Sequence, residues 1–298
     1  MNQQAFILVI GAGLIHALWN IAAKKAGGDA RFACFSNLIM VVVWGPPCIW
    51  AGRHVIGTWG WTEWGFVVGS GAIHVLYFIT LLRGYRKSDL TVVYPLARGS
   101  GPLISSVAAL FILNEQISLV GWFGIAGVVL GVFLIAGGPQ LTDSLLHTDP
   151  HSARHRIIRK GITYGILTGI WIAAYTVVDG YAVKVLKMPP LVTNYYSAFI
   201  QIALLLPTLF KDLPQTRFLW RQQWKPAVIV ATISPASYIL VLTAMQSAPL
   251  SHVAPAREVS MLFAALIGGR LLGEGSRTPR LLGALCIAAG VVALGLGA

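Results

Sequence analysis

Two arginines lie inside apolar stretches that are long enough to cross a lipid bilayer. Arg98 falls within an apolar run over Leu90–Ile112, and Arg257 falls within another over Ser251–Leu271. An arginine at this depth costs about 2.5–3.5 kcal/mol even on a lenient insertion scale. We therefore expect each guanidinium to face a counter-charge or a water-filled cavity, where it can bind an anion through two hydrogen bonds.

The two arginines differ in their surroundings. Arg257 is followed by Glu258, the one carboxylate that the sequence places at real depth, so Arg257 either binds substrate or only pairs with Glu258. Arg98 shares a helix face with Tyr94, one turn earlier. Nearby prolines and glycines remove helix hydrogen bonds, and broken helices at membrane depth hold ions well. We predict that Arg98 binds the anionic group of a substrate, beside an interruption of its helix.

Four further apolar runs carry aromatic and polar side chains about one helical turn apart, two runs in each half of the chain. Any single ring can also serve packing or interface anchoring. Together they predict a central cavity for a small amphipathic molecule with a polar head. The predicted lining residues are His16, Trp19, Asn20, His74, Tyr77, Trp171, Tyr175 and Tyr238.

Proton coupling would need a titratable group at depth. Glu258, His16 and His74 are the candidates, because histidine titrates near neutral pH. Asp179 is predicted to lie near the outer end of its helix, in contact with water. Glu115 and Glu274 end two helices and are expected to be interfacial or capping residues.

The composition indicates an all-α membrane protein. The 298 residues are 56% hydrophobic and 11% charged, whereas soluble domains carry about 25% charged residues. Ten apolar runs approach the roughly 20 residues that a membrane-spanning helix needs. These runs are Gln4–Ala23, Phe32–Ala51, Trp64–Arg83, Leu90–Ile112, Leu119–Gly137, Lys160–Val183, Pro190–Phe210, Pro226–Gln246, Ser251–Leu271 and Pro279–Gly297.

The chain repeats itself. At one constant offset Arg98 aligns with Arg257, Glu115 with Glu274, and Leu113 with Leu272. The predicted division is a first five-helix repeat over 1–138, a linker over 139–159 and a second repeat over 160–298. Because five is odd, the second repeat must enter the membrane inverted relative to the first, a layout typical of secondary transporters.

The loop charges predict the orientation. Most of the 22 lysines and arginines fall in odd-numbered loops, which therefore face the cytoplasm, with both termini outward. This loop position also argues against nucleic-acid binding, despite a net charge of +12. His147, His151 and His155 in the linker are interpreted as part of a solvated basic segment, with metal binding as the alternative. No cofactor or metal is expected, and no phosphate-binding loop motif occurs.

Glycines on the fifth and tenth runs allow close helix approach. Gly127-x-x-x-Gly131 is such a small-residue face. It serves either packing within the bundle or a dimer seam, so the chain is expected to be a monomer or a homodimer.

These features resemble the drug/metabolite transporter superfamily, in its EamA-type branch. The resemblance covers the full length through His16-Ala-Leu-Trp-Asn20, Pro95 to Pro102, Asn114-Glu115, and Pro255 to Leu272-Gly-Glu274. It implies a multi-pass secondary transporter of the bacterial inner membrane, with a central cavity lined by helices 1, 3, 4, 6, 8 and 9. Asn114 replaces the glycine that is frequent at this place in the family.

Three functions are weighed. The first is a secondary transporter, in the export direction, for a small metabolite such as an amino acid. The second is an importer or exchanger of an anionic metabolite such as an organic acid or phosphonate, which two deep arginines favour and Glu258 weakens. The third is a membrane-embedded enzyme, for which the spacing of His16, His74 and Glu258 matches no ligand motif.

Overall fold

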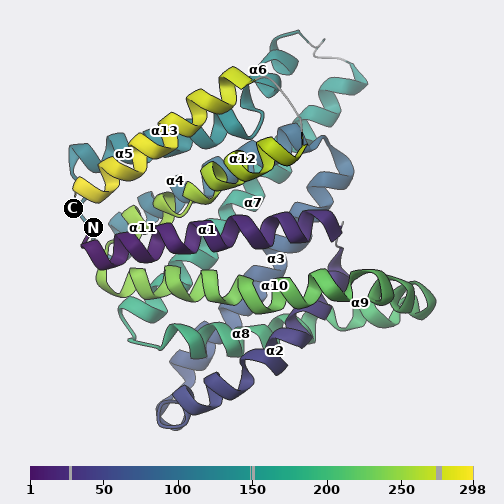
Figure 1. The fold of residues 1–298 in the computed structure, drawn as a ribbon, viewed down its shortest axis with the longest axis vertical. Coiled ribbons are helices and arrows are strands. Elements are labelled where there is room, and N and C mark those ends of the chain that lie inside the picture. Colours follow the sequence, from purple (N-terminus) through teal and green to yellow (C-terminus); the bar gives the residue numbers. More distant parts are fainter. Residues whose placement is uncertain (27–28, 148, 150–151, 273–276, 298) are drawn as a thin grey trace.

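The computed structural model describes residues 1–26, 29–147, 149, 152–272 and 277–297, and these residues form helices and no strand. The predicted all-α class is confirmed (Figure 1). The first half contains α1 (Gln3–Ala26), α2 (Ala30–Gly52), a 3-10 turn η1 (Ile56–Thr58), α3 (Trp61–Lys87), α4 (Leu90–Ile112), α5 (Leu119–Ile135) and α6 (Gly138–His147). The second half contains α7 (Ala153–Lys184), α8 (Pro190–Leu205), α9 (Pro207–Phe210), α10 (Leu213–Ser247), α11 (Leu250–Ala256), α12 (Val259–Leu272) and α13 (Arg277–Leu296). The predictions for His151 and Glu274 fall outside the described residues.

Among the described residues, six helices are long and apolar enough to cross a membrane, or seven if α5 and α6, which meet at 70°, form one span. The sequence predicts ten, and breaks within the predicted runs explain part of the difference. Pro207 opens α9 and leaves α8 only 16 residues long. The run Ser251–Leu271 is divided at Arg257 and Glu258 into α11 and α12. The number ten therefore stays a prediction.

The predicted interruption around Arg98 is wrong. Helix α4 runs unbroken from Leu90 to Ile112 with Pro95 and Pro102 inside it. The corresponding segment of the second half is the one that breaks, at the position of its own arginine. The two arginines therefore stand on different backbones, one on a continuous helix and one at a helix end.

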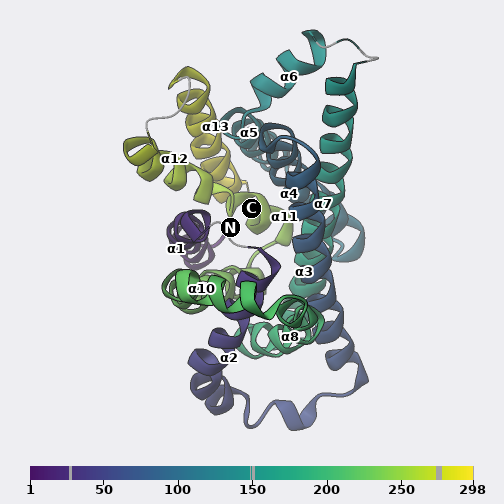
Figure 2. The ribbon, with the colours of Figure 1, turned by 90° about the vertical axis from the view of Figure 1, so that its right-hand side faces the viewer.

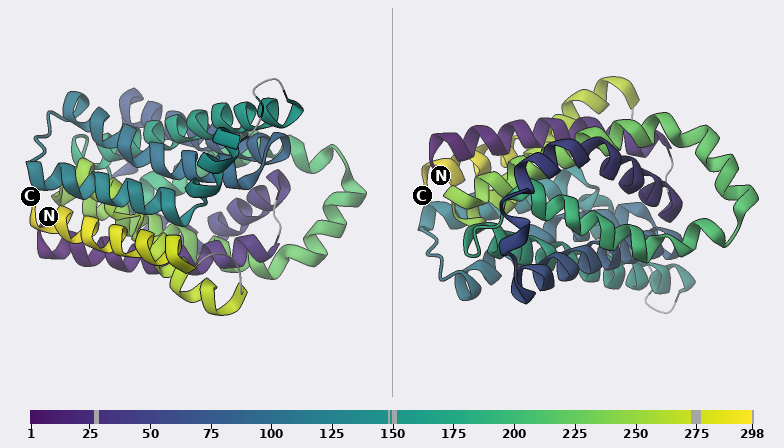
Figure 3. Two further views of the ribbon diagram at one scale, coloured as in Figure 1. Left: turned by 90° about the horizontal axis from the view of Figure 1, so that it is seen from above. Right: turned by 90° about the horizontal axis from the view of Figure 1, so that it is seen from below.

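The two halves have opposite orientations. The ammonium of Met1 donates to the Gly295 carbonyl (3.0 Å), and the Ser118 hydroxyl donates to Gly297 (2.6 Å). Lys184, at the end of α7, pairs with Glu115 on the same side of the molecule. Helix α1 thus begins on the face where its counterpart α7 ends. We call this the terminal face, because both chain ends lie on it (Figure 3).

Helices α5 and α13 pack against each other through glycine, side by side in Figures 1 and 2. A Cβ added at Gly131 would lie 2.5 Å from the carbonyl oxygen of Gly283, and one at Gly283 would lie 2.7 Å from that of Gly131. Backbones that approach this closely leave no room for side chains. The small-residue face of α5 therefore serves packing within the bundle, which decides between the two readings of that motif.

Helices α4 and α7 form a second close pair. Gly161, Gly165 and Gly169 recur every fourth residue on α7 and face α4. Ion pairs join both ends of this helix pair: Asp89–Arg154 at 2.8 Å on one face and Glu115–Lys184 at 2.6 Å on the terminal face. The opposite face, with the starts of α4 and α7, we call the basic face.

The end of α4 is shaped by Asn114, whose φ of 49° lies in the left-handed region. Glycine tolerates this conformation best and asparagine next, so Asn114 is suited to this turn. The turn directs Glu115 at the first turn of α11, where its carboxylate accepts from the N–H groups of Leu250 (2.8 Å) and Ser251 (2.9 Å). The expected capping role of Glu115 is confirmed.

The charge of Glu115 is held by its neighbours. Burial raises the pKa of this carboxyl, but the Lys184 ammonium and the N–H groups of Ser251 and Leu250 outweigh that effect and hold the pKa below its ordinary value of 4.5. Glu115 is therefore ionised at neutral pH, and it joins the end of α4 to the end of α7 and the start of α11.

Candidate functional site

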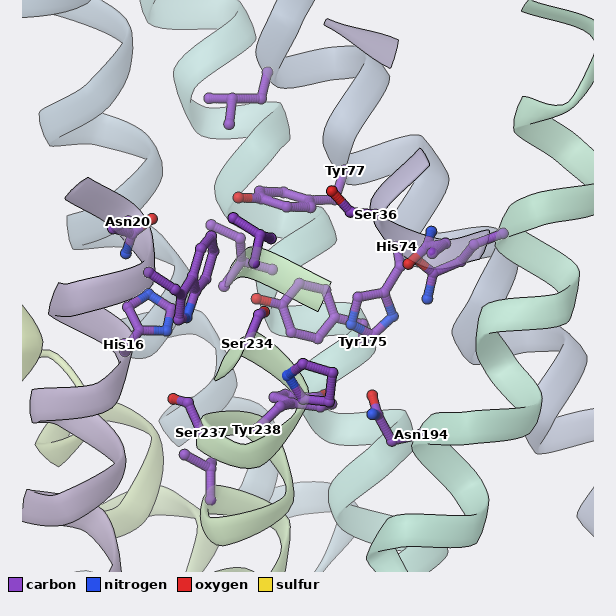
Figure 4. A pocket seen from close by; sticks show the side chains of 18 of the residues that line it. His16, Asn20, Ser36, His74, Tyr77, Tyr175, Asn194, Ser234, Ser237 and Tyr238 are labelled. Atoms are coloured by element: carbon purple, nitrogen blue, oxygen red, sulfur yellow. The ribbon is translucent and has the colours of Figure 1, made fainter. Parts of the chain in front are cut away.

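A cavity of about 330 Å³ lies between the two halves. Its walls come from α1, α2, α3, α4, α7, α8 and α10, with Arg257 from the break between α11 and α12. Ten of the predicted site residues line it: His16, Trp19, Asn20, His74, Tyr77, Tyr94, Arg98, Tyr175, Tyr238 and Arg257. Helices of both halves thus contribute side chains to one hollow (Figure 4).

Arg98 is occupied by an ion pair. Its Nη2 lies 2.7 Å from a carboxylate oxygen of Glu258, and the same atom is 3.4 Å from the Ser260 hydroxyl. The Glu258 side chain is only 1% exposed, so the pair is well shielded from water. The sequence offered Arg257 as a partner of Glu258, and the shorter ion pair is with Arg98. The adjacent carboxylate points instead across the bundle to α4.

Arg257 is the less compensated of the two arginines. Its Nε lies 4.0 Å from Glu258, at the limit of an ion pair, and has no hydrogen-bond partner among the described residues. Arg257 lines the same cavity as Tyr175 and Tyr238. Two guanidinium groups therefore surround one carboxylate, which leaves one positive charge available to an anionic group.

Aromatic rings form one wall. His74 stacks on Tyr175 with ring centroids 4.1 Å apart, and Tyr77 and Tyr238 meet Tyr175 edge-on at 5.7 and 6.3 Å. Figure 4 shows the Tyr175 ring between those of Tyr77 and Tyr238, beside His74. Helices α3, α7 and α10 each supply part of this wall. Such rings enclose an apolar body and offer hydroxyl groups to its polar atoms.

Helices α2 and α8 also reach the cavity, which the sequence reasoning missed. They contribute Ser36, Asn37, Asn194 and Gln201. The Asn37 amide donates to Gln201 (3.1 Å) and joins the two halves. In the sequence these residues are amides and a hydroxyl within apolar runs. They are not part of a repeated pattern of aromatic and polar side chains, which is the pattern that predicted the other lining residues.

Two predicted site residues stand elsewhere. Glu258 lies behind the lining as the partner of Arg98. Trp171 is on α7 but outside the lining, and the stripe of α7 that faces the cavity is Thr168, Ile172 and Tyr175. Of the two rings that the spacing on α7 predicted, Tyr175 lines the cavity and Trp171 does not.

The prediction that Asp179 is in contact with water is wrong. It is 2% exposed and buried rather than solvated. One carboxylate oxygen accepts a hydrogen bond from the Tyr238 hydroxyl. Its position one turn after Tyr175 places it beneath the aromatic wall, on the side of the terminal face.

The comparisons with known proteins agree with this architecture. The model of the EamA-like transporter family matches residues 3–137 and again residues 159–296. The chain belongs to the EamA-like transporter family. It is accordingly a membrane transporter of the drug/metabolite type, and the resemblance inferred from the sequence is confirmed.

A solved structure described only as "Crystal structure of protein" shares the fold, with a TM-score of 0.76 and 13% identity over 99% of this chain and 98% of that one. At that identity the likeness shows the fold alone. No curated protein matches the chain. The substrate must therefore be argued from the cavity.

Proposed function

We propose that this EamA-like protein is a secondary transporter that exports a small amphipathic metabolite, such as an amino acid, by alternating access around the central cavity. The observation that carries the proposal is the incompletely compensated Arg257 beside the aromatic wall. A guanidinium binds a carboxylate bidentately, and the rings enclose an apolar side chain. The helices of this membrane protein form the walls of the site, so a bound substrate exchanges its contacts with water for contacts with their side chains.

The substrate-binding residues that we propose are those of the lining rather than Arg98 alone. Arg257 engages the anionic group, and Tyr77, Tyr175 and Tyr238 surround the body of the molecule. Arg98 and Glu258 form an ion pair beside Arg257, and the Glu258 carboxylate helps to hold the Arg257 guanidinium in position. Asn20 and His16 from α1 offer further polar contacts from the opposite wall.

The proposed export direction is supported by which end of the cavity is closed. The cavity reaches Tyr85 and Tyr94, near the end of α3 and the start of α4 on the basic face. On the terminal face, Glu115 joins α4, α7 and α11. We assign the basic face to the cytoplasm of a bacterial inner membrane, because cytoplasmic loops carry the excess of Lys and Arg. A cavity that extends toward the cytoplasm receives an exported substrate first.

The test is flux in proteoliposomes with a mixture of radiolabelled amino acids as the probe. The Arg257→Gln variant should lose at least about tenfold in transport, the equivalent of 1.4 kcal/mol of binding. Arg154→Gln, which removes an arginine from the exposed pair on the basic face, is the matched control and should transport normally. Equal transport by wild type and Arg257→Gln would contradict the anion-binding role.

The excess of guanidinium groups also favours an importer or exchanger of an anionic metabolite, such as an organic acid or a phosphonate. Thermal stability of the purified protein separates the two. A ligand at 100 times its Kd adds about 2.7 kcal/mol of stability. Stabilisation by zwitterionic amino acids alone supports the first proposal, and stabilisation by dicarboxylates or phosphonates alone supports the second.

A further inference from the structure

Two carboxylates are buried among the described membrane helices, and they are compensated very differently. Glu258 has Arg98 at 2.7 Å and Arg257 at 4.0 Å, so fixed positive charges lie beside its carboxylate. Asp179, which is 2% exposed, forms no ion pair with a lysine or arginine among the described residues. A buried ionised carboxylate without a counter-charge is costly, so a mobile cation must neutralise Asp179.

The groups around Asp179 come from three elements. Tyr238 on α10 donates its hydroxyl hydrogen to one carboxylate oxygen. His74 on α3 interacts electrostatically with the carboxylate, and Ser70, one turn before it, lies close enough to interact as well. The other oxygen, Oδ1, is buried and accepts no hydrogen bond of ordinary geometry among the described residues.

The remaining charged groups nearby face other partners. Arg257 and Arg98 both lie beside Glu258, and Lys184 at the end of α7 pairs with Glu115. On α11, which also packs against α7, His252 interacts with Glu115 and Lys184 rather than with Asp179. His74 is thus the one side chain able to carry a positive charge that interacts with Asp179 in the described part of the chain, beside the hydroxyl of Tyr238.

We propose that Asp179, with His74 and Tyr238, is the proton-binding site that couples transport to the proton gradient. The inference rests on the proposed transport function and names its co-substrate. A proton from cavity water enters through His74 or Tyr238, both of which line the cavity, and binds Oδ1. The carboxylate becomes a neutral acid, the site gains one positive charge, and release of the same proton on the other side restores the carboxylate.

The geometry selects a proton over other cations. Asp179 lies behind the cavity lining, so a substrate ammonium group cannot reach it, whereas hydroxyl and imidazole groups relay a proton. A sodium ion needs several oxygen ligands, in the way that other hard cations do. Here the Ser70 carbonyl already accepts from Nδ1 of His74 at 2.9 Å, which also leaves Nε2 as the free ring nitrogen. Among the described residues no group of three or more His, Cys, Asp or Glu side chains gathers here, so the site lacks the donor set of a metal-ion site.

The proton site is tested without any substrate. Infrared difference spectra of the purified full-length protein, recorded across a pH titration, should show the carbonyl band of a buried protonated carboxyl group. That band should be absent from Asp179→Asn and retained in Asp143→Asn, a variant of an exposed carboxylate that serves as the control. Circular dichroism of Asp179→Asn establishes that the variant is folded. A band that persists in folded Asp179→Asn, or no band in wild type, overturns the proposal.

Coupling is tested in proteoliposomes with the radiolabelled amino-acid mixture. A pH gradient should drive accumulation in wild type and not in Asp179→Asn, while exchange of internal for external label continues in both. Accumulation driven by a sodium gradient, or unchanged pH-driven accumulation in Asp179→Asn, overturns the proton site. If wild type moves no probe amino acid at all, the proposed substrate fails, and the infrared titration still decides whether Asp179 binds a proton.

Discussion

The ion pair of Arg98 and Glu258 allows the contribution of each buried charge to the free energy of unfolding to be separated. Breaking a buried pair costs about 3–5 kcal/mol, because the remaining charge has no partner, whereas removing both partners is often nearly neutral. We expect Arg98→Met to lower the free energy of unfolding by about this amount, and Arg98→Met with Glu258→Gln to recover most of it. Thermal unfolding in detergent measures both.

A matched comparison is the exposed pair on the basic face. Arg154→Met should cost under about 1 kcal/mol, because water already screens its partner Asp89. An Arg98→Met variant no less stable than Arg154→Met would show that Arg257 moves to replace the lost charge, and would contradict the separate roles given to the two arginines.

At this scale the sequence identifies residue types better than partners. Nine predicted side chains on helices line one cavity, because i, i+3 and i+4 spacing fixes the face of a helix, and Arg257 joins them from the break between α11 and α12. The sequence named only Arg257 as a possible partner of Glu258, whereas the shorter ion pair is with Arg98, because sequence neighbours do not show which side chains meet across the bundle. It also left Asp179 in water, because a position near the end of a helix does not show that side chains of α3 and α10 cover the carboxylate.

At the scale of the helices, the turn after α4 requires a left-handed backbone conformation at Asn114. Asn114 has a positive φ, which costs a non-glycine residue roughly 1–2 kcal/mol when its side chain gives no local hydrogen bond. We expect Asn114→Gly to be as stable as wild type and Asn114→Val to lose about 1–2 kcal/mol. Denaturant or thermal unfolding tests the pair of variants. Equal stability of the two would mean that the turn does not require this conformation.

The contact between α5 and α13 makes a second demand. Gly131→Ala places a methyl group 2.5 Å from a backbone oxygen of α13, so the two helices must separate, at a cost of about 1–3 kcal/mol. Gly69→Ala is the control, because a Cβ there meets nothing within 4 Å and alanine favours a helix. A stable Gly131→Ala protein would restore the alternative that this face lies at a dimer seam.

The elements were predictable where a single run of residues determines them. Helices α4 and α7 follow from apolar length, and the glycine repeats indicate close packing. The break between α11 and α12 could not be predicted from its proline. Pro95 and Pro102 lie inside the unbroken helix α4, whereas Pro255 precedes a break. Proline permits a break, and the tertiary environment of each copy decides whether it occurs.

In the whole molecule, the contact of Glu115 with Lys184 and the start of α11 determines whether the terminal face is closed. We expect Glu115→Gln to open it, since the ion pair is lost and the hydrogen bonds to Leu250 and Ser251 become weaker. Each 1.4 kcal/mol removed from the closed state raises the open population about tenfold. Because the pKa of Glu115 is lowered in the folded chain, its contribution is present at neutral pH and is lost as the pH falls below 4.5 and through the folded value.

The measurement is labelling of a Ser234→Cys side chain in the cavity by a membrane-impermeant thiol reagent, applied to the terminal face of oriented vesicles. The native cysteines Cys34, Cys48 and Cys286 are first replaced by serine. Glu115→Gln should label faster than its parent at neutral pH. Glu63→Gln removes a carboxylate that caps the start of α3 in an exposed position and should leave the rate unchanged. Equal rates in the two glutamine variants would show that Glu115 stabilises the fold without controlling access, because a closed terminal face would then depend on helix packing alone.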